Sequence, residues 1–285
     1  MLLIAVPALF QWPIYIKYIP HILSLRRVYV DSIITLSPSV DFARLLADGG
    51  TSLWERALTS EALPLLESAE SLMDTLECNE DMLRANINII ISIIIEGEGI
   101  ARIPESLNRL QDAMNARLRY QKQTPAEIYT KNDEILLYNV QSDYACCLLQ
   151  QNNYVQAEPI FNRCLQKYRE WGTEEEVPYE YSKYNHNMGL CSMYRGDFEA
   201  AVAFADRSVH LMHLATGDSP TTYSWKFNKA CILLQSGDIQ RALELHCEVL
   251  EWRIQQHGVT SYWTAQSYYA VGALQAMAGN LPAAE

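Results

Sequence analysis

With 285 residues and a hydrophobic content of 49%, the chain has enough apolar side chains for a folded core, which argues against an intrinsically disordered protein. Its 34 acidic residues outnumber its 22 basic ones, giving a net charge of -12, and this excess argues against binding to nucleic acid. The seven cysteines form no CxxC pair, so reduced thiols in a cytoplasmic protein are expected rather than disulfide bonds.

Residues 1–40 are expected to form an apolar helical segment that docks on the helices after it. Residues 1–10 are apolar, but they lack the basic start and the small-residue cleavage site of a secretory signal peptide. They are also too few to cross a membrane, so no membrane association is predicted. Trp12, Tyr15, Tyr18 and Leu23 are expected to pack on the first repeat or on a domain upstream.

Residues 41–285 carry a pattern of small residues that repeats along the chain. Gly189, Gly196 and Ala201 show its spacing: a small residue, a turn glycine seven residues later, and an alanine five residues after that. Helices approach closely only where the facing side chains are small, so each set predicts an antiparallel pair, a first helix and a second helix. A marker residue in the second helix recurs at Ala62, Ser106, Ala157, Ala201, Ala242 and Ala284. The pattern predicts an all-α fold, an α-solenoid of about five and a half repeats, the last one incomplete.

Each second helix is predicted to bury one stripe of side chains. Core positions follow the marker residue after four and after seven residues, a spacing that keeps them on one helix face. The predicted stripe residues are Leu66, Ala69, Leu110, Ala113, Phe161, Cys164, Ala205, Ser208, His246 and Val249. The closely packed positions of the first helices are Gly50, Ser92, Ala145, Gly189, Ala230 and Gly272.

The first helix of the second repeat contains two runs of isoleucine, at residues 89–91 and 93–95. Such a segment could also be a buried strand, but the helical repeats on both sides favour a helix. Gly172, Gly217 and Gly258 follow second helices and are expected to close them with a left-handed cap.

The repeat resembles the tetratricopeptide repeat (TPR), in a long form of about 42 residues similar to that of kinesin light chains. Residues 157–159 (Ala-Glu-Pro) and 217–220 (Gly-Asp-Ser-Pro) carry this resemblance. Residues 18–25 and 45–50 are similar to the start of the TPR region in fungal multidomain proteins, where the repeats follow a signalling NTPase of the NACHT or NB-ARC type. The chain has no Gly-Lys dipeptide and hence no phosphate-binding loop, so no NTPase activity is implied for these residues.

No set of residues has the pattern of a catalytic or metal site. No Ser-His-Asp or Cys-His arrangement is supported, so neither an enzyme nor a cofactor is expected. His210 and His213 share a helix face, but no third ligand completes a metal site, and exposed histidines near a helix end are expected instead. His246, on the buried stripe, is expected to be a hydrogen-bonded interior histidine.

The candidate site is a groove along the first helices, which line the concave side of a stacked array. If the closely packed residue of each first helix is numbered eight, position six falls on Asn187 and Asn228. In peptide-binding TPR proteins an asparagine at this position hydrogen-bonds the ligand backbone, since an amide both donates and accepts. Alternatively, both asparagines bond only to the neighbouring helix backbone. The predicted groove residues are Asn139, Asp143, Lys183, His186, Asn187, Tyr194, Phe227, Asn228, Gln266 and Tyr269.

Two functions follow from these patterns. The chain is expected to be a protein–protein interaction scaffold that holds a protein or peptide ligand in the groove. The alternative is the sensor or autoinhibitory arm of a STAND-type signalling NTPase whose nucleotide-binding domain lies outside this chain. Because the sequence stops one residue after Ala284, we expect either a fragment or an open last repeat that a partner covers, such as a second copy in a homo-oligomer.

Overall fold

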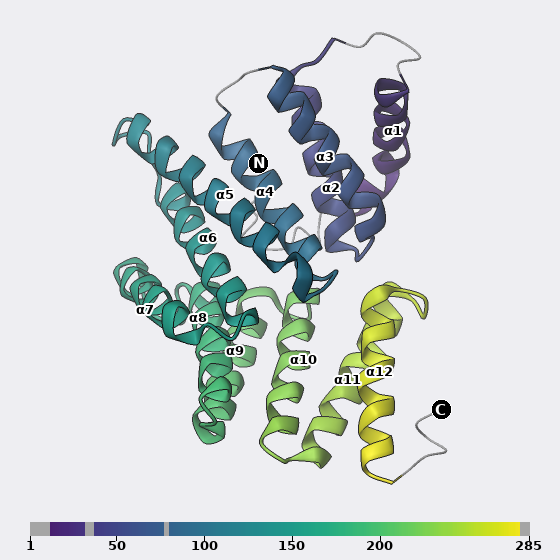
Figure 1. Cartoon of the computed structure of the whole chain (residues 1–285), viewed down its shortest axis with the longest axis vertical. Helices are drawn as coiled ribbons and strands as arrows, with labels where there is room; N and C mark the ends of the chain where they lie inside the picture. Colours follow the sequence, from purple (N-terminus) through teal and green to yellow (C-terminus); the bar gives the residue numbers. More distant parts are fainter. Residues whose placement is uncertain (1–11, 32–36, 77–79, 280–285) are drawn as a thin grey trace. The chain divides into compact units, whose positions relative to one another are not determined.

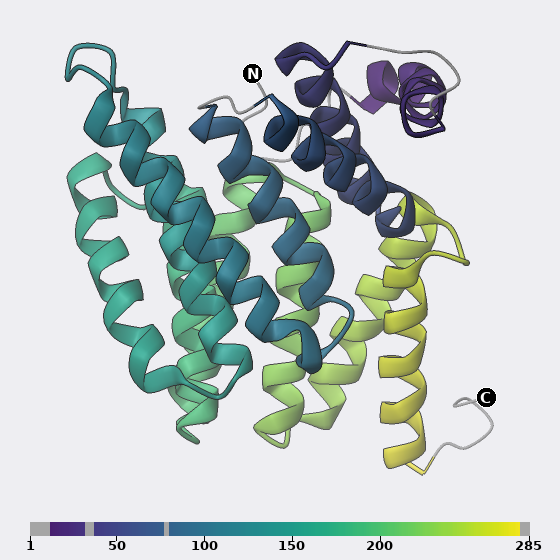
Figure 2. The ribbon, with the colours of Figure 1, turned by 45° about the horizontal axis from the view of Figure 1, so that its top comes forward.

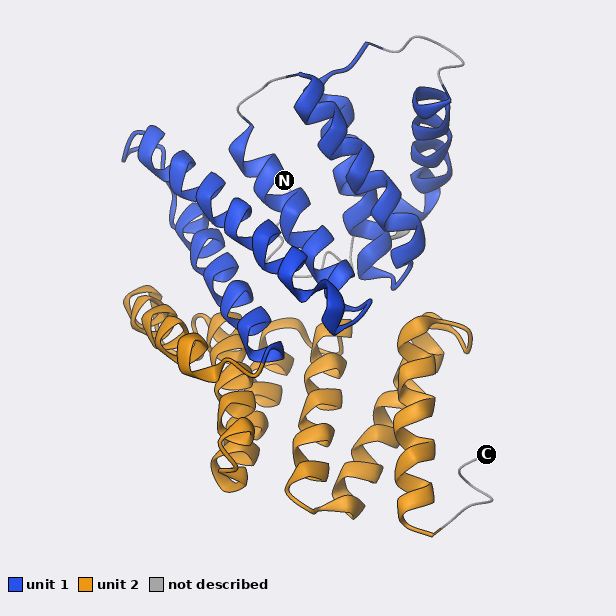
Figure 3. Ribbon diagram, viewed as in Figure 1, with its two compact units in different colours: residues 1–151 blue, residues 152–285 orange. Residues whose placement is uncertain are grey.

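The computed structural model of the chain describes residues 12–31, 37–76 and 80–279. In this part the helices pack mainly against their neighbours in the chain (Figures 1 and 2), as stacked helix pairs require. The chain divides into two compact units, residues 1–151 (unit 1) and residues 152–285 (unit 2), which Figure 3 shows in different colours. The predicted all-α fold is confirmed for the described residues.

The described part of unit 1 consists of α1 (Trp12–Val30), α2 (Val40–Glu55), α3 (Thr59–Thr75), α4 (Asp81–Glu96), the 3-10 turn η2 (Ile100–Arg102), α5 (Ile103–Gln123) and α6 (Lys131–Gln150). α2 pairs with α3 and α4 pairs with α5, in the order that the small-residue pattern predicts. The helix α1 packs on α2 and α3.

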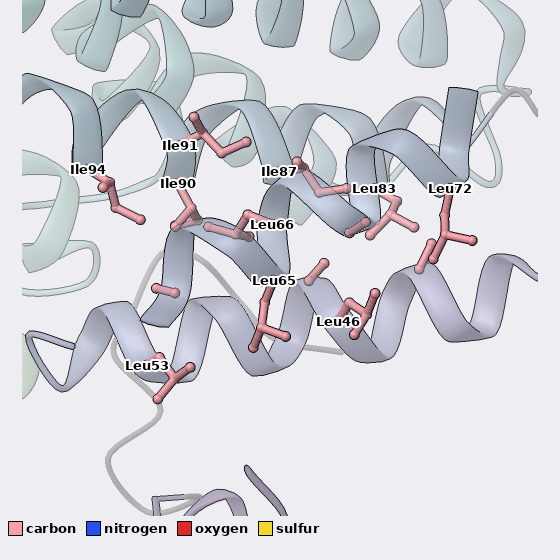
Figure 4. Packing of buried hydrophobic residues seen from close by; sticks show 14 of the residues in the cluster. Leu46, Leu53, Leu65, Leu66, Leu72, Leu83, Ile87, Ile90, Ile91 and Ile94 are labelled. Carbon is pink, nitrogen blue, oxygen red and sulfur yellow. The ribbon is translucent and has the colours of Figure 1, made fainter. Parts of the chain in front are cut away.

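The isoleucine runs of the second repeat lie in α4, so the strand alternative is wrong. α4 is apolar on more than one face because it lies between two core clusters. Ile90 and Ile94 pack with side chains of α2 and α3 (Figure 4), whereas Ile89 packs with side chains of α5 and α6. Burial on two sides accounts for a helix that lacks the polar face of an ordinary surface helix.

The helices α2 and α3 approach closely at Gly50. A β-carbon at this position would lie 2.7 Å from Leu66 Cγ and 3.2 Å from Ala62 O, well inside normal contact distances. Leu66 is fully buried in the cluster of Figure 4. The closely packed position predicted for this first helix is therefore occupied by the one residue type that fits.

The helix α1 contacts the first repeat through apolar side chains and one arginine. Ile19 and Ile22 are buried, while Tyr18 is 49% exposed and lies outside the contact. Arg26 Nε donates to Pro64 O at 2.9 Å and to Ser68 Oγ at 2.8 Å, which fixes α1 against α3. Residues 1–11 and the side chain at position 12 lie outside the described part of the chain.

The described part of unit 2 consists of α7 (Tyr154–Trp171), α8 (Pro178–Tyr194), α9 (Phe198–Thr216), α10 (Pro220–Gln235), α11 (Ile239–His257) and α12 (Tyr262–Met277). α8 pairs with α9, α10 pairs with α11, and α12 packs on α11. Asp197, Ser219 and Asp238 cap the starts of three of these helices, each accepting a hydrogen bond from the backbone N–H three residues on. The marker Ala284 lies outside the described residues.

The predicted buried stripe of the second helices is confirmed. All ten stripe residues, and all five marker residues that the structure describes, are at most 2% exposed. Leu66, Phe161 and His246 therefore occupy the same register in three different helices despite their different sizes. The four-and-three spacing alone places these positions on the inner face of each second helix.

In four repeats, a turn residue with positive φ lies five residues before the marker. Gly196 and Gly237 have φ of 79° and 88°. Ala57 and Asn152 take the same place with φ of 60° and 59°, although neither is a glycine, so the small-residue pattern misses both. The second repeat differs because its longer turn places Gly99, with φ of 128°, seven residues before Ser106.

All three predicted glycine caps have positive φ, but none of them is left-handed helical. Gly217 and Gly258 follow α9 and α11 with φ of 61° and 79°, and their ψ values of -146° and 169° are extended. This combination is open essentially to glycine alone, so both glycines are required by the backbone. Gly172, after α7, has an almost fully extended backbone.

Candidate functional site

On the first helices of unit 2, the structure brings together two of the predicted groove residues and one tryptophan. His186 of α8 stacks on Trp225 of α10, with ring centroids 4.2 Å apart and an interplanar angle of 21°. Asn228, three residues after Trp225 and hence on the same face of α10, places its Nδ2 3.3 Å from His186 Nε2. These contacts join two neighbouring first helices.

The buried environment keeps His186 neutral. Its side chain is 5% exposed, and burial, followed by the positive charge of Lys183, lowers the pKa of His186 to about 4. A neutral ring offers an acceptor nitrogen, which suits the amide donor of Asn228. The histidine therefore acts as a hydrogen-bonding group at neutral pH and not as a cation.

Phe227 lies in a different contact, between α10 and α11. Its ring meets His246 edge-on at 4.7 Å, and the guanidinium of Arg253 lies 4.7 Å from the ring centroid. Arg253 in turn donates to Trp263 O at 2.9 Å and to Gln266 Oε1 at 3.1 Å, both on α12. The predicted residues Phe227 and Gln266 are thus connected through an arginine that the sequence pattern does not single out.

The remaining predicted residues of unit 2 differ in accessibility. Asn187 is 3% exposed and belongs to the interior of the unit. Lys183 is half-buried, whereas Tyr194 and Tyr269 are 41% and 80% exposed. Tyr269 therefore offers the largest accessible aromatic surface among the predicted groove residues.

The two predicted residues of unit 1 lie on α6. Asn139 is 7% exposed, and its Oδ1 has no hydrogen-bond donor among the described residues. Asp143 is half-buried. Together with Asp133 it opposes the effect of burial, which lowers the pKa of Arg117 to about 10.

Several aromatic side chains of unit 2 are missed by the position-six rule. Trp252 of α11 stacks on Tyr223 of α10 at 4.2 Å with an interplanar angle of 8°. His257 lies edge-on to Trp252 and to Trp263, at 5.7 Å and 5.0 Å. The three-residue spacing between Trp225 and Asn228 could have placed Trp225 on the candidate face from the sequence. The stacking of aromatic rings from two different helices cannot be predicted from spacing in this way.

Interior histidine His246 lacks the hydrogen bond expected for it at one ring nitrogen. It is 1% exposed, and its Nδ1 has no partner among the described residues. Burial, followed by the charge of Arg253, lowers the pKa of His246 to about 4. The ring is held by its packing against Phe227.

Two cavities lie between successive second helices rather than on the first helices. One, of about 440 Å³, is lined by α3, α4 and α5 in unit 1, and the other, of about 580 Å³, by α7, α8 and α9 in unit 2. None of the ten predicted groove residues lines either of them. In the unit 1 cavity, Arg84, Arg109 and Arg119 each form a salt bridge of 2.6–2.9 Å with a carboxylate.

Several of the cysteines are buried, and several of the histidines are exposed. Burial raises the pKa of Cys147 and of Cys191 to about 12, so both thiols stay protonated at neutral pH. His210 and His213 are exposed, and His213 Nδ1 lies 3.5 Å from an Asp218 carboxylate oxygen. Within the described residues, no three His, Cys, Asp or Glu side chains come close enough to share a metal ion. In the same part of the chain, no helix has both the length and the apolar character needed to cross a membrane.

Comparison with known proteins identifies the fold alone. No family model matches the chain, and no curated protein matches it in sequence. Among solved structures, the chain is similar to the crystal structure of BtubC (BKLC) from P. vanneervenii, with a TM-score of 0.51 and 16% sequence identity over 85% of this chain and 86% of that one. Together with the paired helices and their buried stripes, this likeness shows an α-solenoid of the TPR-like type.

Proposed function

We propose that the chain is a protein-interaction scaffold that binds a peptide or protein segment along α8, α10 and α12 of unit 2. The TPR-like fold supports this proposal, because stacked helix pairs present extended binding surfaces. The observation that carries it is the joined set of His186, Trp225 and Asn228, which places an amide beside a stacked aromatic pair on two neighbouring first helices.

In this proposal Asn228 is the residue that contacts the ligand backbone. Its bond to His186 is long, at 3.3 Å, and uses only the amide nitrogen. The amide oxygen can accept a ligand N–H while the nitrogen stays on the histidine. Tyr269 and Gln266, both exposed on α12, extend the surface with an aromatic ring and a second amide. Asn187, being buried, supports the helix and does not bind.

Peptides selected on the whole chain from a random peptide library provide the probe for this surface. Asn228→Ala and Tyr269→Ala should each weaken their binding by about 1–3 kcal/mol, measured by fluorescence polarisation. Tyr268→Ala is the matched control, since this neighbouring tyrosine is 46% exposed but points to another sector of α12. Selected peptides whose affinity is the same for the wild type and for both variants would contradict the proposal.

The sensor or autoinhibitory arm of a STAND-type NTPase is the alternative function. It rests on the resemblance of residues 18–25 and 45–50 to fungal proteins. In the structure these segments meet: Gly49 leaves room for Ile22, since a β-carbon there would lie 3.1 Å from Ile22 Cγ2. Helix packing alone is a sufficient reason for this glycine, so we favour the scaffold. A full-length transcript that encodes a Gly-Lys-Ser/Thr loop upstream would reverse this preference.

We also propose that the exposed face of α12 supports association with a second copy of the chain. Tyr262 and Met277 are 53% and 62% exposed and lie about 60° apart around this helix. Exposed apolar side chains on one helix favour association. Sedimentation velocity should show a concentration-dependent dimer that Met277→Ser weakens. A chain that stays monomeric at all concentrations would exclude this assembly.

A further inference from the structure

The cavity of about 580 Å³ in unit 2 is large enough to hold a side chain of a bound peptide. It is lined by residues of α7, α8 and α9 and by part of the loop between α7 and α8. No predicted groove residue lines it, so any ligand here would occupy a second site that is independent of the first-helix surface.

The walls of this cavity combine apolar and polar groups, with Thr173 and Asn185 among the polar ones. Leu165 of α7 and Phe204 of α9 face it together with the rings of Tyr181 and Tyr184 of α8. Both tyrosine hydroxyls are already engaged, since Tyr181 donates to the carbonyl of residue 172 at 3.1 Å and Tyr184 to the side-chain oxygen of residue 162 at 3.3 Å. The rings are therefore fixed at their polar tips and leave apolar surface to the cavity.

One cation at this cavity has no ion-pair partner among the described residues. Arg169, on the last turn of α7, lines the cavity, is exposed, and forms neither a hydrogen bond nor an ion pair with any other described residue. The nearby Glu174 is already paired with another arginine, because Arg207 Nε donates to Glu174 Oε2 at 2.7 Å. Glu175 is exposed on the loop and supplies a second charge of opposite sign.

We propose that this cavity binds a peptide segment in which a large apolar side chain stands next to an acidic one. The apolar side chain fills the space between Tyr181, Tyr184 and Phe204, where it loses contact with water. The acidic side chain meets Arg169, whose planar guanidinium matches a carboxylate with two parallel hydrogen bonds.

Glu175 decides between a peptide and a small free carboxylate as the occupant. A lone carboxylate ligand gains nothing from a second acidic group beside its cation. A peptide carries backbone N–H donors next to its acidic side chain, and Glu175 can accept them. Charges of both signs at one cavity therefore favour a peptide and also set its direction.

The test uses the whole chain and peptides selected on it from a random peptide library. Peptides bound at this site should share an apolar residue beside Asp or Glu. Arg169→Gln should weaken them about tenfold, the effect of one charge-assisted hydrogen-bonding group. Arg163→Gln is the matched control, because it removes an exposed arginine six residues earlier on the same helix that does not line the cavity.

A charge reversal makes the test independent of folding defects. The Arg169→Glu variant should no longer bind the selected peptides. It should instead bind versions of them in which the acidic residue is replaced by Lys. Circular dichroism should show unchanged melting, since Arg169 is exposed. Failure to enrich any such peptide, or affinities unchanged by Arg169→Gln, would overturn the proposal. Peptides that respond to Asn228→Ala but not to Arg169→Gln would also overturn it, while supporting the first-helix surface.

Discussion

Arg117 of unit 1 and Arg253 of unit 2 occupy the same position in two different repeats. Each continues the buried stripe of its second helix, lying eleven residues after Ser106 or Ala242, and each is at most 3% exposed. Neither guanidinium forms a salt bridge with a described residue, and burial lowers the pKa of each to about 10. Neutral acceptors take the place of carboxylates, with Asn86 Oδ1 at 2.7 Å from Arg117.

Replacing Arg253 with methionine should lower the free energy of unfolding by about 2–4 kcal/mol. The substitution keeps most of the volume but leaves Trp263 O and Ser267 Oγ without their donor, each now 2.9 Å from Arg253 Nη1. Urea denaturation followed by circular dichroism measures the change. The exposed Arg241, on the same helix, is the control, and Arg241→Met should cost less than about 0.5 kcal/mol. Equal losses for the two variants would show that the buried bonds contribute nothing.

Acidification should destabilise unit 2 through His186, His246 and His257. Burial is the first cause that lowers the pKa of each to about 4, and a nearby cation, Lys183 or Arg253, adds to it. The unfolded chain takes up these protons near pH 6.5, whereas the folded chain does not. Stability is therefore complete above about pH 7 and falls between pH 6.5 and 4, by about 1.4 kcal/mol per pH unit for each histidine that stays neutral.

The measurement is the urea midpoint as a function of pH. His246→Met should flatten its decline between pH 6.5 and 4, because one of the three groups is removed. His210→Gln, at an exposed histidine, should leave the decline unchanged. A midpoint that does not change over this range would show that the three rings are protonated in the folded chain.

Gly50→Ala should destabilise unit 1 by about 1–3 kcal/mol, the usual cost of overpacking a core. The new methyl group would lie 2.7 Å from Leu66 Cγ, and Leu66 is fully buried, so the helices must move apart. Thermal unfolding measures the loss. Gly97→Ala serves as control, since Gly97 has an α-helical φ of -64° and is exposed, and its melting temperature should not fall. An unchanged melting temperature for Gly50→Ala would mean that α2 and α3 are not in close contact.

Ala57→Gly should raise the free energy of unfolding by about 0.5–1 kcal/mol. An alanine at φ of 60° is sterically strained, and glycine relieves this strain. We expect the relief to exceed the free-energy cost of the greater backbone entropy that glycine gives the unfolded chain. Asn152→Gly at φ of 59° should change stability less, because asparagine tolerates this conformation. Differential scanning calorimetry compares the two variants. A destabilised Ala57→Gly chain would show that the buried methyl group matters more than the backbone strain.

The fold follows from the sequence because each second helix repeats one simple spacing. Leu66, Phe161 and His246 share a register that a four-and-three spacing identifies without knowledge of their partners. The turns at Ala57 and Asn152 could not be found in this way, since both residues have positive φ although neither is a glycine.

The candidate site was less predictable, because a helix position fixes a face but not what the side chain reaches. Asn228 lies on the expected face, yet its partner His186 comes from another helix. Phe227, one residue earlier, turns towards α11 instead. Arg169 has no sequence signal at all, since its significance lies in the absence of an ion-pair partner among the described residues.

In the described part of either unit, a pulling force at the ends is resisted mainly by contacts between helices that are close along the chain. The pairs α2–α3 and α10–α11 can each open without first breaking a contact that spans the whole unit. We therefore expect such a unit to open one helix pair at a time under force and to refold in the same steps.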